Sequence, residues 1–355
     1  MESLVVNRAF WQDKRVLVTG HTGFKGSWLC LWLEKLGAEV IGFSNGIPTR
    51  PSLYEDAAID RELIDVTGDV RERVAVREVV ERYRPEIVFH LAAQSLVRRS
   101  YACPLETYET NVIGTANILE ASHAIAQVVV VVTSDKCYAR SPDDRPHKET
   151  DPLGGADPYS SSKACAELVA FAYRSTLRDK GPAVASVRAG NVIGGGDWAE
   201  DRLLPDLVRG GLAGNAVPIR SPNAIRPWQH VLNPLEGYLL LAERLPGDRA
   251  YAEAWNFGPE PADERSVLSI AARFAELWDV EMTTIPAKGP HPPESPVLRL
   301  DSGKARDLLG WCPRWNLDAA LFRVVEWTEA YRHGEDLRRT MVDQIQAHQQ
   351  DEMRA

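Results

Sequence analysis

The sequence predicts a doubly wound α/β domain built on a parallel sheet, followed by a smaller, mixed α/β lobe. Over the first 190 residues, apolar strand-like runs alternate with amphipathic helical stretches. The run from Val128 to Val132 is apolar at every position. A sheet with one wet face would alternate in polarity, so this run indicates helices on both faces. After residue 190 the chain becomes rich in Gly, Pro and Arg, which favours shorter, mixed elements.

The elements follow in order from these patterns. Strands are expected at residues 15–19, 40–43, 87–91, 128–134 and 184–188, and another before residue 69. Helices are expected at residues 25–36, 71–83, 104–123 and 158–178. Residues 1–190 would form the nucleotide-binding domain, residues 191–333 a substrate lobe partly interleaved with it, and residues 334–355 a polar, helical tail with little apolar periodicity.

Composition excludes several classes of protein. The 355 residues carry a net charge of −9, which argues against binding to nucleic-acid phosphates. The five cysteines are scattered without a CxxC pair, so neither a zinc site nor a disulfide framework is expected, and a reducing cytoplasm fits best. No stretch approaches the roughly 20 apolar residues of a membrane span, and residues 1–14 lack the apolar run of a signal peptide.

A glycine turn marks a dinucleotide site. Gly20, Gly23 and Gly26 follow a buried strand and open a helix. Glycines at this spacing permit a tight turn and a close approach of the backbone to a pyrophosphate at the helix N-terminus. The context makes the motif more specific than the glycines alone, for which an ordinary structural turn is the alternative. The contacts expected here are Gly20, His21, Gly23, Phe24, Lys25 and Gly26.

The choice between NAD and NADP depends on the end of the second strand. A ribose-binding carboxylate is expected about 20 residues after the glycines. Here the chain reads Phe43-Ser44-Asn45, which leaves Ser44 as a weaker ribose partner. Arg50 lies near enough in sequence to keep NADP open, but we expect NAD.

Further cofactor contacts are expected where later strands end, because ligands lie at the carboxyl edge of such sheets. Asp69 could meet the adenine; its alternative role is that of N-cap for the next helix. The full expected set beyond the glycine turn is Ser44, Asp69, Val70, Leu91, Ala92, Ala93 and Asn111.

A proton-transfer group is expected from two neighbouring segments. Asp157 and Pro158 predict a helix start, which puts Tyr159 and Lys163 on one helix face. We expect a nearby ammonium and an oxidised nicotinamide to lower the Tyr159 pKa toward the range of a general base. Ser134 ends the preceding strand and could hydrogen-bond the same substrate oxygen, its alternative role being to cap the next turn.

These motifs together resemble the extended short-chain dehydrogenase/reductase family that acts on nucleotide sugars, over nearly the whole chain. Within it, the chain is similar to the 4,6-dehydratases of CDP-linked sugars. The matching strings are residues 20–29, 134–138, 188–198 and 226–231. The resemblance implies a Rossmann fold, NAD as cofactor, CDP-glucose as substrate, a role in deoxysugar and O-antigen polysaccharide biosynthesis, and a helix-bundle homodimer or a homotetramer.

The resemblance also implies a reaction. Tyr159, with Ser134 and Lys163, would take the C4 hydroxyl proton as C4 is oxidised. Lys136 would then remove the C5 proton while Asp135 protonates the departing C6 hydroxyl. The hydride would return to C6 and a proton to C5, which gives the 4-keto-6-deoxy sugar without net redox change. The wider dehydratase group has glutamate where this chain has Lys136. Lys136 would need to be neutral to act as a base; otherwise it would stabilise an enolate.

The resemblance assigns the nucleotide diphosphate and the sugar mainly to the second lobe. Arginine suits a diphosphate because its planar fork engages two phosphate oxygens, although Arg220 and Arg226 could be ordinary surface charges. His291 stands where relatives carry an arginine. The expected substrate contacts are Gln94, Asn191, Arg202, Leu203, Arg220, Arg226, Gln229 and His291.

Two other functions stay open from the sequence. A nucleotide-sugar epimerase or reductase of the same fold would need Tyr159 and Lys163 but not the acid and amine at Asp135 and Lys136. A dinucleotide-sensing protein without catalysis would keep only the glycine turn.

Overall fold

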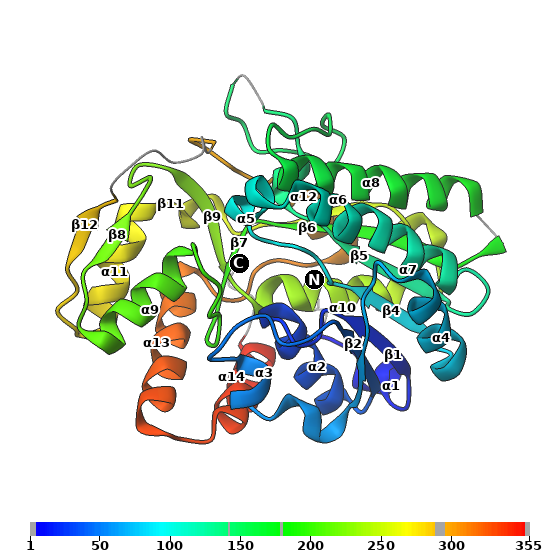
Figure 1. The fold of residues 1–355 in the computed structure, drawn as a ribbon, viewed down its shortest axis with the longest axis horizontal. Helices are drawn as coiled ribbons and strands as arrows, with labels where there is room; N and C mark the ends of the chain where they lie inside the picture. Colours follow the sequence, from blue (N-terminus) through cyan, green and yellow to red (C-terminus); the bar gives the residue numbers. More distant parts are fainter. Residues whose placement is uncertain (1–4, 141–142, 178–179, 288–294, 352–355) are drawn as a thin grey trace.

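A seven-stranded parallel sheet forms the centre of the molecule (Figure 1), as the computed structural model shows for residues 5–140, 143–177, 180–287 and 295–351. The strand order is β10-β6-β5-β4-β1-β2-β3, and every neighbouring pair is parallel. The order reverses between β1 and β4, which gives the doubly wound arrangement of a Rossmann sheet. The fold class expected from the sequence is confirmed. The strands are β1 (Arg15–Thr19), β2 (Glu39–Ser44), β3 (Ile64–Thr67), β4 (Ile87–His90), β5 (Val128–Val132), β6 (Ala183–Ala189) and β10 (Ala254–Phe257).

Helices cover both faces of this sheet, as the all-apolar strand β5 requires. Val128 and Val130 belong to one apolar cluster, and Val129 and Val131 belong to the other. The first cluster includes side chains of α2 and α10, and the second includes side chains of α4, α7 and α8. These helices are α2 (Phe24–Leu36), α4 (Arg73–Tyr83), α7 (Gly114–Ser122), α8 (Pro158–Leu177) and α10 (Leu232–Arg244). Among the described helices, none is long and apolar enough to cross a membrane.

A second lobe lies beside the sheet, on the left in Figure 1. It contains a three-stranded sheet, β11-β9-β7, and a parallel pair, β12-β8. Between β9 and β11 the chain returns to the main sheet, where β10 pairs with β6 at the edge. The strands are β7 (Asn191–Ile193), β8 (Val217–Ile219), β9 (Ile225–His230), β11 (Glu264–Ser266) and β12 (Thr284–Pro286). The remaining helices are α1 (Arg8–Trp11), α3 (Leu53–Asp56), α5 (Val97–Ala102), α6 (Pro104–Tyr108), α9 (Leu203–Ala213), α11 (Val267–Trp278), α12 (Gly303–Leu309), α13 (Leu317–His333) and α14 (Leu337–Gln350).

Two expected elements differ in the structure. The helix expected at residues 104–123 is interrupted by a π-helical turn, η2 (Glu109–Ile113), between α6 and α7. Such turns insert one residue into a helix and occur often at functional sites. The strand expected at residues 128–134 stops at Val132, and Ser134 caps the short helix η3 (Asp135–Cys137) instead.

The expectation of little apolar periodicity at residues 334–355 was wrong for the part described. Helix α14 places Leu337, Met341 and Ile345 on one side at four-residue spacing, and all three are buried. This stripe packs in the same apolar cluster as Trp32 of α2. His348, one turn further, is also buried and hydrogen-bonds Asn233 of α10 over 3.0 Å. The segment is therefore part of the folded body.

Replacing Met341 by alanine should lower the free energy of unfolding by about 2–5 kcal/mol, because a fully buried side chain leaves a cavity. Arg339→Ala is the control: its side chain is 82% exposed and its pairing with Asp343 spans 3.9 Å. The control should shift stability by less than about 0.5 kcal/mol. Urea denaturation measures both, and equal effects would show that α14 lies outside the cooperative unit.

Candidate active site

The glycine turn forms a tight cradle between β1 and α2. Gly20 has a φ of +74°, and a Cβ there would lie 2.8 Å from the backbone of Ala92. A Cβ on Gly26 would lie 2.2 Å from the carbonyl oxygen of Gly20. Neither position can hold a side chain, which leaves backbone N–H groups at the N-terminus of α2 open to a ligand. This is the geometry that a dinucleotide pyrophosphate needs.

The His21 side chain lies beneath the turn and is committed to protein contacts. Its ring nitrogens contact the Asp65 carboxylate at 3.0 Å and the Ser44 hydroxyl at 3.0 Å. Burial lowers the pKa of His21, although Asp65 opposes this effect. Ser44 at the end of β2 is thus held by His21. Asp65 belongs to this network and was missed by the sequence analysis because β3, which carries it, was only loosely placed.

Asp69 lies beyond β3 with its carboxylate already engaged. It accepts hydrogen bonds from the backbone N–H of Arg71 at 2.9 Å and from the guanidinium of Arg71, and from Asn45 at 3.2 Å. The Arg71 hydrogen bonds lower the pKa of Asp69 to about 2. It caps the turn before α4 rather than the helix itself, whose N-cap is Glu72. Asp69 and Asn45 together form the polar end of the expected adenine site.

The segment after β4 meets the glycine turn and the π-helical turn. The backbone N–H of Ala92 donates to the Thr19 hydroxyl at 3.1 Å, which ties this segment to β1. Asn111 of η2 accepts from the backbone N–H of Gln94 at 2.8 Å and donates to its carbonyl at 3.0 Å. The Gln94 side chain hydrogen-bonds the backbone of Leu96 in its own loop and the hydroxyl of Thr107 on α6. The Gln94 amide therefore holds this loop in place. Leu91 and Ala93 belong to the same segment after β4.

The turn after β5 presents the expected acid. The Ser134 hydroxyl donates to Asp135 Oδ1 at 3.0 Å and accepts from the backbone N–H of Lys136 at 3.2 Å. Ser134 therefore caps η3, and it also hydrogen-bonds Tyr159. The other carboxyl oxygen of Asp135 is buried and lacks a partner among the described residues. Burial raises the pKa of Asp135, which favours the protonated form that a general acid requires.

Helix α8 begins as expected and presents Tyr159 and Lys163. Asp157 Oδ1 accepts from the backbone N–H of Ser160 at 2.9 Å, which caps the first turn. Lys163 donates to the carbonyl of Val132 at 3.1 Å, and burial lowers its pKa to about 8 against the opposing charge of Glu167.

The direction expected for the Tyr159 pKa was wrong for the protein by itself. Burial raises this pKa to about 12, and the hydrogen bond with Ser134 offsets only part of the rise. Arg202 is the cation that lowers it, because Lys163 is directed to a backbone carbonyl instead. A positive ligand charge is needed to bring Tyr159 into the range of a general base.

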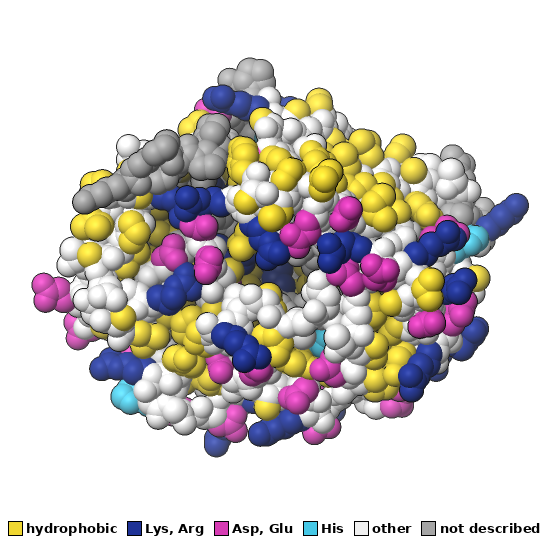
Figure 2. All heavy atoms as spheres, viewed as in Figure 1, with side chains coloured by type: hydrophobic (Ala, Val, Ile, Leu, Met, Phe, Trp, Pro, Cys, Tyr) yellow, Lys and Arg dark blue, Asp and Glu magenta, His cyan; other side chains and the backbone are white. Residues whose placement is uncertain are grey.

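Cations from both lobes converge on this turn. The half-buried Lys25 has its pKa lowered to about 7 by desolvation and by the charges of Arg202 and Lys163, while Asp135 and Asp197 oppose the shift. Figure 2 shows a hollow at the centre of this face with Lys and Arg side chains in its wall. An anionic ligand would meet a positive field there.

The expected second-lobe residues divide into two groups. Arg202 pairs with Asp197 at 3.0 Å and contacts Ser95 at 3.2 Å, so it bridges the lobes. Arg226 is buried and contributes positive charge at Asp135. Gln229 donates to the carbonyl of Phe257 at 2.6 Å, and its buried side-chain oxygen lacks a partner among the described residues.

The remaining expected residues have other contacts or positions, or lie outside the described residues. Arg220 binds Asp201 at 2.5 Å on the surface. Leu203 begins α9 and packs on the core, and Asn191 begins β7. His291 lies outside the described residues. Asp197 was missed, although it stands in the string at residues 188–198 that carried the resemblance.

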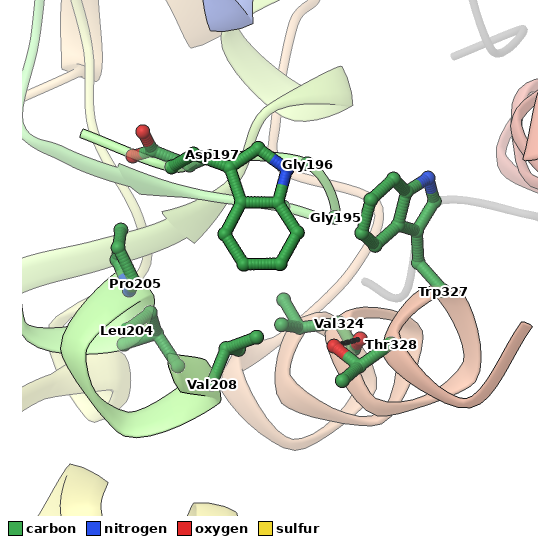
Figure 3. Close-up of a pocket in the computed structure, with 11 residues that line it drawn as sticks. Gly195, Gly196, Asp197, Leu204, Pro205, Val208, Val324, Trp327 and Thr328 are labelled. Carbon is green, nitrogen blue, oxygen red and sulfur yellow. Dashed lines mark hydrogen bonds between the residues drawn. The ribbon is translucent and has the colours of Figure 1, made fainter. Parts of the chain in front are cut away.

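The loop at residues 194–198 follows β7 and lines a small cavity against α13 (Figure 3). Its walls are mostly apolar and include Leu204, Val208 and Trp327. A Cβ on Gly194 would lie 3.0 Å from the ring of Phe24, so this loop also contacts the glycine turn. The part of the chain that the structure describes contains no group of three or more His, Cys, Asp or Glu side chains that could hold a metal ion.

Comparison with known proteins gives a consistent result. The model of the NAD dependent epimerase/dehydratase family matches residues 16–258. A CDP-glucose 4,6-dehydratase of Salmonella typhimurium is 47% identical over 342 residues, which are 94% of this chain and 95% of that protein. A probable dTDP-glucose 4,6-dehydratase of Sinorhizobium fredii is 27% identical, over 88% of this chain and 92% of its own length.

Solved structures show the same architecture. A dTDP-glucose 4,6-dehydratase from Streptomyces venezuelae, crystallised with NAD, superposes with a TM-score of 0.76 at 26% identity. The match covers 91% of this chain and 99% of that one. A UDP-glucose 4-epimerase from Thermus thermophilus with NAD has a TM-score of 0.78 at 24% identity, which shows the shared fold.

Replacing Gly26 by alanine should weaken NAD binding at least about tenfold, because the new Cβ would force the Gly20 carbonyl and the turn apart. Gly247→Ala is the control, since the nearest atom to its Cβ is 3.7 Å away. Isothermal titration with NAD measures both variants. An unchanged affinity in Gly26→Ala would show that the cradle does not hold the cofactor.

Proposed function

Because the chain belongs to the NAD dependent epimerase/dehydratase family, we propose that it is a hydro-lyase that converts CDP-D-glucose to CDP-4-keto-6-deoxy-D-glucose and water. The observation that carries this proposal is the buried Asp135, whose Oδ1 accepts from Ser134 while its Oδ2 has no hydrogen-bond partner among the described residues. An acid and an amine next to the Tyr159 and Lys163 pair are what elimination of a hydroxyl group needs. We also propose a cytoplasmic location, because the five cysteines are scattered along the sequence without a CxxC pair.

NAD is the cofactor, in keeping with the family. When bound, it supplies the acceptor for the C4 hydride and the donor of that hydride to C6. The cradle of Gly20 and Gly26 fits its pyrophosphate, and Asp69 with Asn45 would face the adenine. Arg50, which kept NADP open, is 78% exposed and pairs with Glu55.

Tyr159 would take the proton from the C4 hydroxyl. The hydrogen bond with Ser134 would hold the Tyr159 phenol in place. Its raised pKa means that the phenol stays protonated until positive charge reaches the site. Lys163 lies one helical turn away, fixed by the Val132 carbonyl, and completes the group that orients the reacting oxygen. The positive charge of an oxidised nicotinamide would lower this pKa and so favour proton removal.

Water loss would follow at the turn after β5. Oxidation at C4 acidifies the C5 hydrogen, and Lys136 would either remove this proton or stabilise the enolate that its loss produces. Asp135 would donate a proton from its free oxygen to the C6 hydroxyl as that group departs. Its raised pKa supports this role, because a carboxyl that is ionised at neutral pH could not donate.

The diphosphate would be held where Arg202 and Arg226 meet Lys25. Arg202 and Lys25 lie close enough to each other to raise the local positive potential, and Arg226 adds charge at Asp135. Two phosphate groups would relieve the repulsion among these cations. The epimerase or reductase reading is less well supported, because it assigns no task to Asp135 and Lys136.

We also propose that two copies pair through α6, η2 and α8. Leu105, Ile113, Leu168 and Phe171 on these elements are 53–76% exposed. Figure 2 shows hydrophobic side chains gathered over this part of the surface, where Figure 1 places α6 and α8. A second copy of the same helices would bury this apolar patch as a four-helix contact.

Wild-type protein with NAD should form the 4-keto-6-deoxy product from CDP-glucose, and Asp135→Asn should form it about 10²–10⁴ times more slowly. The amide cannot give up a proton to the leaving hydroxyl, whereas oxidation at C4 does not require Asp135. Near-ultraviolet absorbance of reduced nicotinamide should therefore accumulate in the variant during a single turnover.

Three further sugars test the nucleotide: dTDP-glucose, UDP-glucose and GDP-mannose, assayed by mass spectrometry of the product. A product that is epimerised or reduced rather than dehydrated would replace the proposal with the rival function. Normal dehydration by Asp135→Asn would remove Asp135 from the role of acid.

Leu168→Glu should convert the protein from dimer to monomer, because a carboxylate would be desolvated in the proposed four-helix contact. Leu308→Glu on α12 is a matched control, since Leu308 is 58% exposed, against 55% for Leu168, and is not on α6, η2 or α8. Sedimentation velocity gives the mass of each. A wild-type monomer, or a dimer that survives Leu168→Glu, would contradict the proposed assembly.

A further inference from the structure

A buried ion pair lies directly behind the catalytic turn. Glu167 of α8 accepts from the Nε of Arg188 at 2.9 Å and from its Nη2 at 2.8 Å. Both side chains are about 2% exposed. Burial opposes ionisation of Glu167, but the hydrogen bonds and the charge of Arg188 outweigh it and hold the Glu167 pKa below its usual value. The pair is therefore charged, and its hydrogen bonds go to protein groups.

Two hydroxyl groups bind the Glu167 carboxylate, one from the residue after β5 and one from β6. Thr133 donates to Glu167 at 2.5 Å, and Ser186 of β6 donates to it at 2.7 Å. Thr133 immediately precedes Ser134 and Asp135, so this bond fixes the chain where it enters the catalytic turn. Ser186 lies within a strand and makes an equivalent bond at a position without catalytic neighbours.

The other member of the pair fixes the chain where it leaves the turn. Arg188 Nη1 donates to the Tyr138 hydroxyl at 2.7 Å, and its guanidinium lies over the Tyr138 ring. The Tyr138 hydroxyl in turn donates to Asn256 of β10 at 2.7 Å. The turn that carries Ser134, Asp135 and Lys136 is thus clamped at both ends by one ion pair.

We propose that Glu167 and Arg188 are positioning residues, which hold the catalytic turn in register with Tyr159 through Thr133 and Tyr138. A buried ion pair is a poor source of stability, because its desolvation offsets its attraction, so a positioning role accounts better for its presence. A displacement of about 1 Å at such a turn can cost roughly a hundredfold in rate. This inference rests on the proposed function insofar as it uses the rate of dehydration.

The test compares two variants that each remove one hydroxyl from the same carboxylate. Thr133→Val should lower kcat at least about tenfold with little change in KM, because the acid moves while the sugar-binding groups do not. Ser186→Ala should keep kcat within about twofold. Thr133→Ser should restore the rate, since it returns the hydroxyl. All three should show similar melting temperatures if folding alone is not responsible.

Tyr138→Phe tests the other end and should lower kcat as Thr133→Val does, because Arg188 loses its acceptor there. Hydrogen–deuterium exchange gives a readout that does not depend on activity: residues 134–138 should exchange faster in Thr133→Val and Tyr138→Phe than in Ser186→Ala. Equal exchange and equal kcat in Thr133→Val and Ser186→Ala would overturn the proposal. Faster exchange in a protein that dehydrates no sugar would uphold the clamp and reject the proposed function.

Discussion

When helices cover both faces of a parallel sheet, the polar side chains that can bind a ligand are found at the carboxyl ends of its strands. Every side chain of β5 is buried, so polar groups on this strand would be desolvated without a ligand to bind. The first polar side chains after β5, Thr133 to Lys136, come where the strand has ended. The same holds for the segment after β4 and for the glycine turn after β1. The candidate site is built from the segments that follow these strands, because the strands themselves are packed in the apolar core and leave no room for a ligand.

Desolvation by the core also shifts the pKa values of the ionisable side chains at the site. Burial raises the pKa of Tyr159 and of Asp135 and lowers that of Lys163 and of Lys25. Each shift disfavours the charged form. A ligand that brings both positive and negative charge, as a nicotinamide and a diphosphate do, would therefore change several protonation states together.

The sequence predicted the layers of the fold because those depend on local pattern, whereas the roles of Asp135 and Lys136 come from the family resemblance and stay a prediction. A run of five valines predicts a strand buried on both faces, and Tyr159 with Lys163 follows from helix spacing. What it missed depends on contacts between distant segments. That Lys163 is directed to the Val132 carbonyl, that Gln94 holds its own loop, and that residues 337–350 pack on α2 follow from tertiary packing, which local propensity does not encode.

The late position of β10 in the chain has a consequence for how the protein is made. Strand β6 ends at Ala189, but its outer neighbour β10 begins only at Ala254, after the second-lobe strands β7, β8 and β9. During synthesis the edge of β6 stays unpaired while these residues emerge, and closing so long a loop is entropically slow. The two lobes therefore cannot mature one after the other. Until β10 has been synthesised, the unpaired edge of β6 is exposed to pairing with other chains, which promotes aggregation.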